Sequence, residues 1–327
     1  MEYVECNLCG LDNTRLMFHA RERNIKEKRV FNLVKCKTCG LVYLNPRPTK
    51  KEINAYYPPW YHSRAAKEIV DIEKTMIWGI PWREAMQKKA KPILRYKKEG
   101  RILDIGCGDG SLLKFMKELG WETHGIDFNE GSARYAREVL GLDVFSGRLE
   151  EVSYSKDFFD IIILFHVLEH LPDPLKTLER VWPLLKEDGV LLIEVPNFAS
   201  FEARVFRSRW IGIDAPVHLY QFTPHTLEAM LKNAGFNTTE LGFITEQTKY
   251  VAGYSESLRY FLMDWGLYPL RKKQTGYKNK EDSGNACGSS WNNSLHSVEY
   301  VIFYSIAYIM DKLGLGSNLL AVAKKQI

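Results

Sequence analysis

The chain has 327 residues, which exceeds a typical single domain and predicts two domains or one elaborated domain. Hydrophobic residues make up 45% and charged residues 26%, and a net charge of +5 lacks the dense basic stripe typical of nucleic-acid-binding proteins. The first five residues have neither the basic region nor the apolar region of a secretory signal. No apolar run reaches the length of a transmembrane helix. We therefore expect a cytoplasmic protein with reduced thiols and no nucleic-acid partner.

Four of the six cysteines form two pairs, each with two residues between the thiols and a glycine after the second: Cys6 with Cys9, and Cys36 with Cys39. This gap lets both thiolates of a pair reach one ion, so two pairs supply the ligands of a tetrahedral zinc site. Four thiolates leave no position for water or substrate, and we expect a structural zinc. The spacing predicts a zinc ribbon over residues 1–48, which is too short to fold on a hydrophobic core alone.

The next segment, residues 49–98, has a helical pattern broken by Pro58 and Pro59, and we interpret it as a helical linker or lid. From residue 99 to 327, strand and helix patterns alternate, which predicts an α/β domain with a doubly wound, mostly parallel sheet. Its first strands are Arg101–Ile105 and Glu122–Asp127, joined by a glycine-rich turn and a helix over residues 111–119. Ligands of such sheets bind outside the carboxyl ends of the strands.

The turn after the first strand reads Asp-x-Gly-x-Gly-x-Gly from Asp104 to Gly110. Its glycines let the backbone approach a ligand, and Asp127, at the end of the next strand, can accept hydrogen bonds from both ribose hydroxyls. A dinucleotide-binding turn needs a third glycine where this chain has Ser111. An acid at Asp104 suits the sulfonium and amino groups of S-adenosylmethionine better than a pyrophosphate, so the turn favours S-adenosylmethionine over a nicotinamide cofactor.

Five sequence segments together resemble the class I S-adenosylmethionine-dependent methyltransferases, especially the branch with ubiquinone-biosynthesis O-methyltransferases: residues 103–110, Asp127, 159–160, 166–170 and 191–197. The resemblance covers about residues 99–247 and implies a seven-stranded Rossmann-like sheet. It also implies that the cofactor contacts Asp104, Gly106, Cys107, Gly108, Gly110, Asp127, Phe128, Leu149 and His166. Many relatives have an aspartate for the adenine amino group at the position of Arg148, which cannot accept that bond. Either a backbone contact from Leu149 or the Glu150 side chain would then take the place of the aspartate at the adenine amino group.

The four-cysteine segment with this core also resembles the sugar C-methyltransferases. Methyl transfer to carbon is therefore the alternative to transfer to oxygen, and a non-catalytic cofactor-binding or zinc-binding interaction protein is the rival class. The acceptor is expected to be a small molecule, a glycan or a lipid-linked compound.

Two histidines flank an acid after the fourth predicted strand, in the order His166-x-x-Glu169-His170. This is the inverted form of a zinc-protease motif, so a catalytic metal is an alternative to a neutral histidine that orients cofactor or substrate. A long loop over residues 198–220 follows the fifth strand and carries His218 and Tyr220. These two residues are the candidates for a general base, with His166 as the competitor.

A helical insertion is expected at about residues 248–312, before a last strand over residues 318–322. It contains an aromatic-rich segment (258–268), a polar segment (279–290) and an apolar helix (298–313). The helix either packs on the core or lies at the inner membrane surface, where the 258–313 region would make a peripheral contact.

Overall fold

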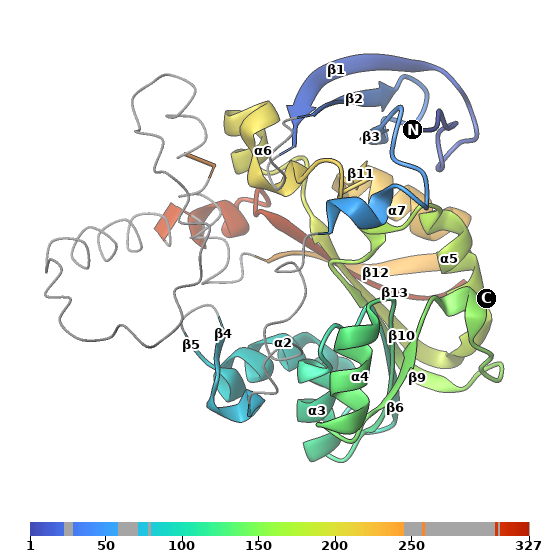
Figure 1. The fold of residues 1–327 in the computed structure, drawn as a ribbon, viewed down its shortest axis with the longest axis vertical. Helices are drawn as coiled ribbons and strands as arrows, with labels where there is room; N and C mark the ends of the chain where they lie inside the picture. The colour runs from blue at the N-terminus through green and yellow to red at the C-terminus, as the bar shows by residue number, and fades with distance from the viewer. Residues whose placement is uncertain are drawn as a thin grey trace, which may run out of the picture.

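The computed structural model describes residues 1–22, 29–57, 71–77, 80–244, 257–258, 305–306 and 308–326. These residues form a seven-stranded sheet, a four-stranded sheet near the N-terminus, and a short hairpin of β4 (Met76–Ile77) and β5 (Ile80–Pro81). Figure 1 shows the four-stranded sheet at the top of the view, above the seven-stranded sheet.

The seven-stranded sheet has the spatial order β12, β13, β10, β9, β6, β7, β8. All its strands run parallel except β13, which is antiparallel to both of its neighbours, β10 and β12. The strands are β6 (Arg101–Ile105), β7 (Glu122–Asp127), β8 (Asp143–Ser146), β9 (Phe159–Phe165), β10 (Leu185–Pro196), β12 (Phe236–Ile244) and β13 (Asn318–Lys325). The predicted mostly parallel, seven-stranded α/β sheet is therefore confirmed, and its last strand continues beyond the predicted end at residue 322.

Helices cover both faces of this sheet because successive strand residues point to opposite sides. In β6, Ile102 belongs to one buried cluster and Leu103 to the other. The cluster that contains Ile102 packs under α2 (Trp82–Tyr96), α3 (Ser111–Glu118) and α4 (Glu130–Glu138). The cluster that contains Leu103 packs under α5 (Pro174–Val181) and α7 (Pro224–Asn233). Local signals fix the helix starts: Thr223 caps α7 by accepting from the Thr226 amide, with Pro224 in the first turn.

The segment between the two sheets, residues 49–98, is described over 49–57, 71–77 and 80–98. Its described residues form two 3₁₀ turns, Ile53–Tyr56 and Ile72–Lys74, before α2 begins at Trp82. The Trp82 side chain is fully buried, with its ring 6.2 Å from that of Phe115 in α3. The division into residues 1–48, 49–98 and 99–327 stays a prediction.

The N-terminal sheet contains β1 (Thr14–Arg21), β2 (Val30–Cys36), β3 (Val42–Leu44) and β11 (Tyr220–Gln221), in that spatial order. β11 comes from the loop that follows β10, and it pairs antiparallel with β3 through Tyr220 and Tyr43. The cysteine-bearing segment is thus joined by hydrogen bonds to the loop that carries His218. Figure 1 shows β11 directly beneath β3.

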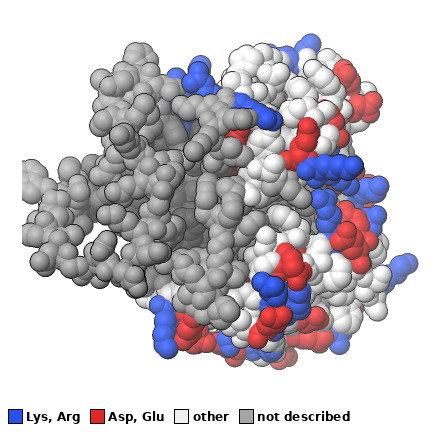
Figure 2. All heavy atoms as spheres, in the orientation of Figure 1, with Lys and Arg blue, Asp and Glu red and all other residues white. Residues whose placement is uncertain are grey.

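The loop after β10 is ordered by short helices: α6 (Phe201–Phe206) and the 3₁₀ turns Arg207–Arg209 and Ile211–Ile213. Most of the predicted insertion, including the polar segment 279–290, lies outside the described residues. Among those that are described, no helix has the length and apolar character needed to cross a membrane. Basic and acidic side chains are interspersed over the described part of the face in Figure 2.

Candidate active site

A cavity of about 310 Å³ lies at the carboxyl ends of β6, β7 and β9, the edge where the sheet predicts a ligand. Its lining includes the residues that follow each of these strands, namely Gly106, Asp127 and His166. The opposite lining comes from before the methyltransferase-like core, through Glu2, Tyr57 and residues 48–50. Thr49, Lys50 and Tyr57 belong to the segment interpreted as a linker or lid, whereas a contribution of Glu2 and Pro48 was not predicted from the sequence.

Two glycines of the glycine-rich turn have different surroundings: Gly108 faces open space, and Gly106 packs closely against a neighbouring side chain. Gly108 has φ +58°, a Cβ there would meet no protein atom within 4 Å, and the residue lines the cavity. At Gly106, with φ +79°, a Cβ would lie 2.4 Å from the Val167 side chain. The Asp127 carboxylate holds the turn, because it accepts hydrogen bonds from the amides of Gly108 and Asn129, each at 2.8 Å.

An exposed aromatic ring stands beside Asp127. Phe128 is 50% exposed although it lines the cavity, and the ring of Tyr57 meets it edge-on at 5.4 Å. Large apolar side chains in clefts commonly bind ligands, so this ring suits a flat base. Leu149 and Arg148 also line the cavity, and the Arg148 amide donates to the Glu151 carboxylate at 2.9 Å.

Of the predicted cofactor residues, the structure brings six to the cavity: Gly106, Gly108, Asp127, Phe128, Leu149 and His166. Asp104, Cys107 and Gly110 are not among the lining residues. Gly110 has a packing role, because a Cβ there would lie 2.7 Å from the Leu142 side chain. Asp104 is 6% exposed, and burial raises the pKa of its carboxyl to about 7.

His166 occupies an unusual position between two buried acids. Its φ of +57° is uncommon for a residue other than glycine, and such strain often marks a functional position. Nε2 lies 3.1 Å from Glu194 Oε1, and Nδ1 lies 3.4 Å from Glu169 Oε1. Both ring nitrogens therefore face carboxylate oxygens, and the amide nitrogen of Asn318 also lies 3.2 Å from Nε2.

A second group of ionisable side chains lies next to His166. The loop after β10 folds back so that the Leu219 amide donates to the Glu169 carbonyl at 2.8 Å, which brings His218 to His170 with ring centroids 4.5 Å apart. Burial and the nearby His218 lower the pKa of His170 to about 3. Burial opposes ionisation of Glu169, but the three surrounding histidines lower its pKa to about 2. His170 lines the cavity and His218 does not.

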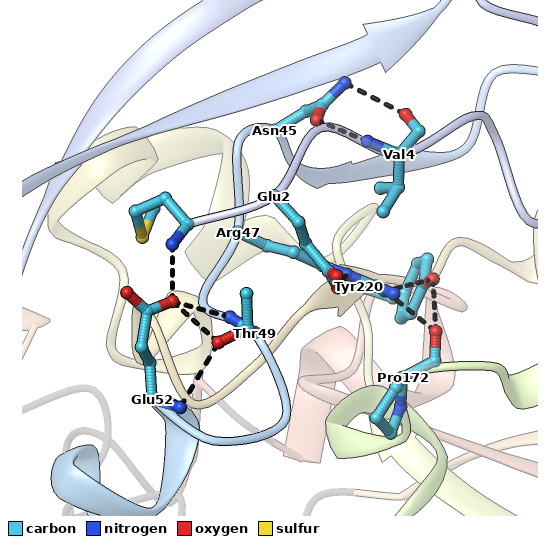
Figure 3. Close-up of polar contacts among 9 residues, drawn as sticks. Glu2, Val4, Asn45, Arg47, Thr49, Glu52, Pro172 and Tyr220 are labelled. Atoms are coloured by element: carbon cyan, nitrogen blue, oxygen red, sulfur yellow. Dashed lines mark hydrogen bonds and ion pairs between the residues drawn. The ribbon is translucent and has the colours of Figure 1, made fainter.

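Tyr220, a candidate base from sequence, has its hydroxyl in another network (Figure 3). The hydroxyl donates to the Pro172 carbonyl at 3.0 Å and accepts from the Arg47 guanidinium at 2.9 Å. Arg47 also donates to Pro172 at 2.7 Å and to Glu2 at 2.9 Å. Burial raises the pKa of Tyr220 to about 12. Tyr220 and Arg47 therefore link the N-terminal segment to the core. The Tyr220 hydroxyl is engaged in this link, which makes it a poor candidate for the general base.

The four paired cysteines meet as their spacing predicts. The sulfur atoms of Cys6 and Cys39 are 3.4 Å apart, those of Cys9 and Cys36 are 3.6 Å apart, and all four lie within 4.8 Å of one another. Burial opposes ionisation of Cys36, but hydrogen bonds from nearby amides lower the pKa of its thiol to about 7. This donor set and compactness fit a tetrahedral zinc ion.

Comparisons with known proteins agree with this geometry. Residues 82–241 match the family described as a methyltransferase domain. The chain is 34% identical over 157 residues to the ubiquinone biosynthesis O-methyltransferase of a Ruegeria species, covering 44% of this chain and 63% of that protein. It is 28% identical over 159 residues to the enzyme of the same name from Azorhizobium caulinodans, covering 45% of this chain and 63% of the relative.

Among solved structures, the fold is similar to that of the 4+2 cyclase SpnF, with a TM-score of 0.51 at 16% identity, covering 86% of this chain and 97% of that one. Residues 82–241 are therefore similar to methyltransferase domains, in agreement with the motifs, and the likeness to the solved structure concerns the fold. The match spans less than two thirds of the length of these two relatives.

Proposed function

We propose that the protein transfers a methyl group from S-adenosylmethionine to a hydroxyl oxygen of a small-molecule acceptor. The observation that carries the proposal is a single cavity in which the open glycine turn at Gly108, the Asp127 carboxylate and two histidines lie together. The relatives named as O-methyltransferases support oxygen as the methyl-accepting atom.

The cofactor would occupy the part of the cavity formed by the residues after β6 and β7. Asp127 would accept hydrogen bonds from the ribose hydroxyls, and the half-exposed Phe128 ring would pack on the adenine. Gly108 leaves the space that the amino-acid end needs. When bound, S-adenosylmethionine supplies an activated methyl group on a sulfonium sulfur. The protein then has to provide mainly proximity and orientation.

The acceptor would enter beside His170, and its hydroxyl proton would go to His218. The Nδ1 atom of His218 lies 2.8 Å from the Gly212 carbonyl and donates to it, so the neutral ring carries its lone pair on Nε2. As the oxygen attacks the methyl carbon, the bond from sulfur to carbon breaks and the proton moves to that nitrogen. His166 is less suited to this role because both of its nitrogens face carboxylates.

The finer assignments from the sequence are part of this proposal. We assign a structural zinc ion to the four cysteines, on the basis of their donor chemistry and separation. A glycan or lipid-linked acceptor, a cytoplasmic location and a peripheral membrane contact through residues 258–313 remain hypotheses. Sugar C-methylation is the second candidate, and the four-cysteine segment favours it.

The test is methyl transfer by the full chain. The protein would be incubated with S-adenosylmethionine radiolabelled in its methyl group and with separate small-molecule, glycan and lipid extracts. Asp127→Asn would serve as the control with weakened cofactor binding, at a cofactor concentration below its dissociation constant. A labelled product whose new carbon has the NMR shift of a methoxy group supports the proposal. A C-methyl product favours the second candidate, and cofactor binding without any labelled product contradicts both.

A further inference from the structure

Glu169, His170 and His218 form a compact cluster of potential metal ligands outside the four-cysteine site. Their donor atoms all lie within 4.8 Å of one another. His170 lines the active-site cavity, whereas Glu169 and His218 are not among its lining residues, so the cluster reaches the cavity through His170. Sequence order alone pairs Glu169 with His170 and His166, and only the folding of the loop after β10 brings in His218.

The Glu169 side chain lacks the partners that a buried carboxylate requires. It is 1% exposed, and neither of its oxygens has a hydrogen-bond partner among the described residues. Its ion-pair contact is with His166 at 3.4 Å, and His166 lies closer to a second buried acid, Glu194, at 3.1 Å. A buried carboxylate whose oxygens accept no hydrogen bond is costly, and a cation bound to Glu169 would offset that cost.

Both histidines of the cluster are held as metal-binding histidines usually are. The Nδ1 atom of His170 lies 3.1 Å from the Val217 carbonyl, and that of His218 lies 2.8 Å from the Gly212 carbonyl. A ring N–H that donates to a backbone carbonyl fixes the tautomer and orients the lone pair of Nε2. The two lone pairs and the Glu169 carboxylate then make a site of two nitrogens and one oxygen.

From these observations we infer that Glu169, His170 and His218 bind a divalent cation at the wall of the active-site cavity. Two imidazoles and one carboxylate suit Mn²⁺, Fe²⁺, Co²⁺ or Zn²⁺ and leave coordination positions open. The proposed methyl transfer gives the site its role: the acceptor hydroxyl binds the cation and loses its proton more readily. With a cation bound, the Nε2 lone pair of His218 would bind the cation instead of taking the proton, and the hydroxyl proton would leave to water. This role rests on the proposed function, whereas cation binding does not.

The experiment is a Mn²⁺ titration of the full chain, loaded beforehand with one equivalent of zinc and followed by electron paramagnetic resonance of free Mn²⁺. Mn²⁺ is the probe because it prefers nitrogen and oxygen ligands over thiolates. The unmodified protein should bind one Mn²⁺ per chain. Glu169→Gln and His218→Ala should each weaken binding at least about tenfold. His225→Ala, an exposed histidine on α7, should bind Mn²⁺ as the unmodified protein does.

Calorimetry with S-adenosylmethionine checks that each variant is folded. Glu169→Gln is nearly the same shape as the native residue, so retained cofactor affinity with lost Mn²⁺ binding supports the site. The inference is overturned if the unmodified chain binds no Mn²⁺, or if both variants that keep cofactor affinity bind it as tightly as the unmodified chain. Mn²⁺ binding without methyl transfer would refute the proposed function and leave the metal site standing.

Discussion

Replacing Asp127 with asparagine is expected to weaken S-adenosylmethionine binding by about 1.5–3 kcal/mol, the range for hydrogen bonds to a charged group. The two carboxylate oxygens already accept hydrogen bonds from two backbone amides, that of Gly108 in the turn and that of Asn129 at the start of α4, at 2.8 Å each. Asparagine keeps one acceptor oxygen but turns its NH₂ group toward the other amide. The variant should therefore lose the charged bond to the ribose and also loosen the turn.

This free energy corresponds to cofactor affinity about 10- to 150-fold lower. Isothermal titration calorimetry of the purified chain measures it directly, with thermal melting as a check on folding. Asp143→Asn is the matched control, because its side chain is 73% exposed and pairs with His124 on the surface of the sheet. If the Asp127 variant binds the cofactor within twofold of the unmodified protein, the ribose assignment is wrong.

Three further predictions concern protonation, the metal and the acceptor. Asp104 has a pKa of about 7 because it is buried; a cationic ligand favours its carboxylate, so cofactor affinity should rise as the pH increases from 5 to 7 and level off above. Asp104→Asn should flatten that calorimetric profile, and a flat profile in the unmodified protein would contradict the idea. Cys36→Ser should lose one zinc per chain by elemental analysis and also weaken cofactor binding, since residues 48–50 line the cavity; unchanged affinity would mean that this wall holds without zinc. His218→Ala should keep cofactor affinity while single-turnover rates fall about 10²–10⁴-fold, and turnover within threefold of the parent across pH 6–8 would remove His218 from the reaction.

The sequence by itself determined the features that depend on short-range order. The two-residue gap between Cys6 and Cys9 predicts that both thiolates bind one metal ion. The turn from Asp104 to Gly110 predicts that the backbone comes close to a bound cofactor. The strand Glu122–Asp127 and the cap at Thr223 also agree with the structure, because alternation and capping act over a few residues. These local patterns were sufficient for the fold class and for six of the residues that line the cavity.

The tertiary structure decided which distant segments meet. Tyr220 is a plausible proton acceptor in a list of polar loop residues, yet its pairing with β3 and its bonds to Arg47 and Pro172 occupy its hydroxyl. His218 reaches Glu169 and His170 only because the loop after β10 folds back along Glu169. Contacts of this kind depend on the packing of whole elements, since no periodicity links residues so far apart in the chain. The contribution of Glu2 and Pro48 to the cavity wall has the same origin, which is why it could not be predicted from local patterns.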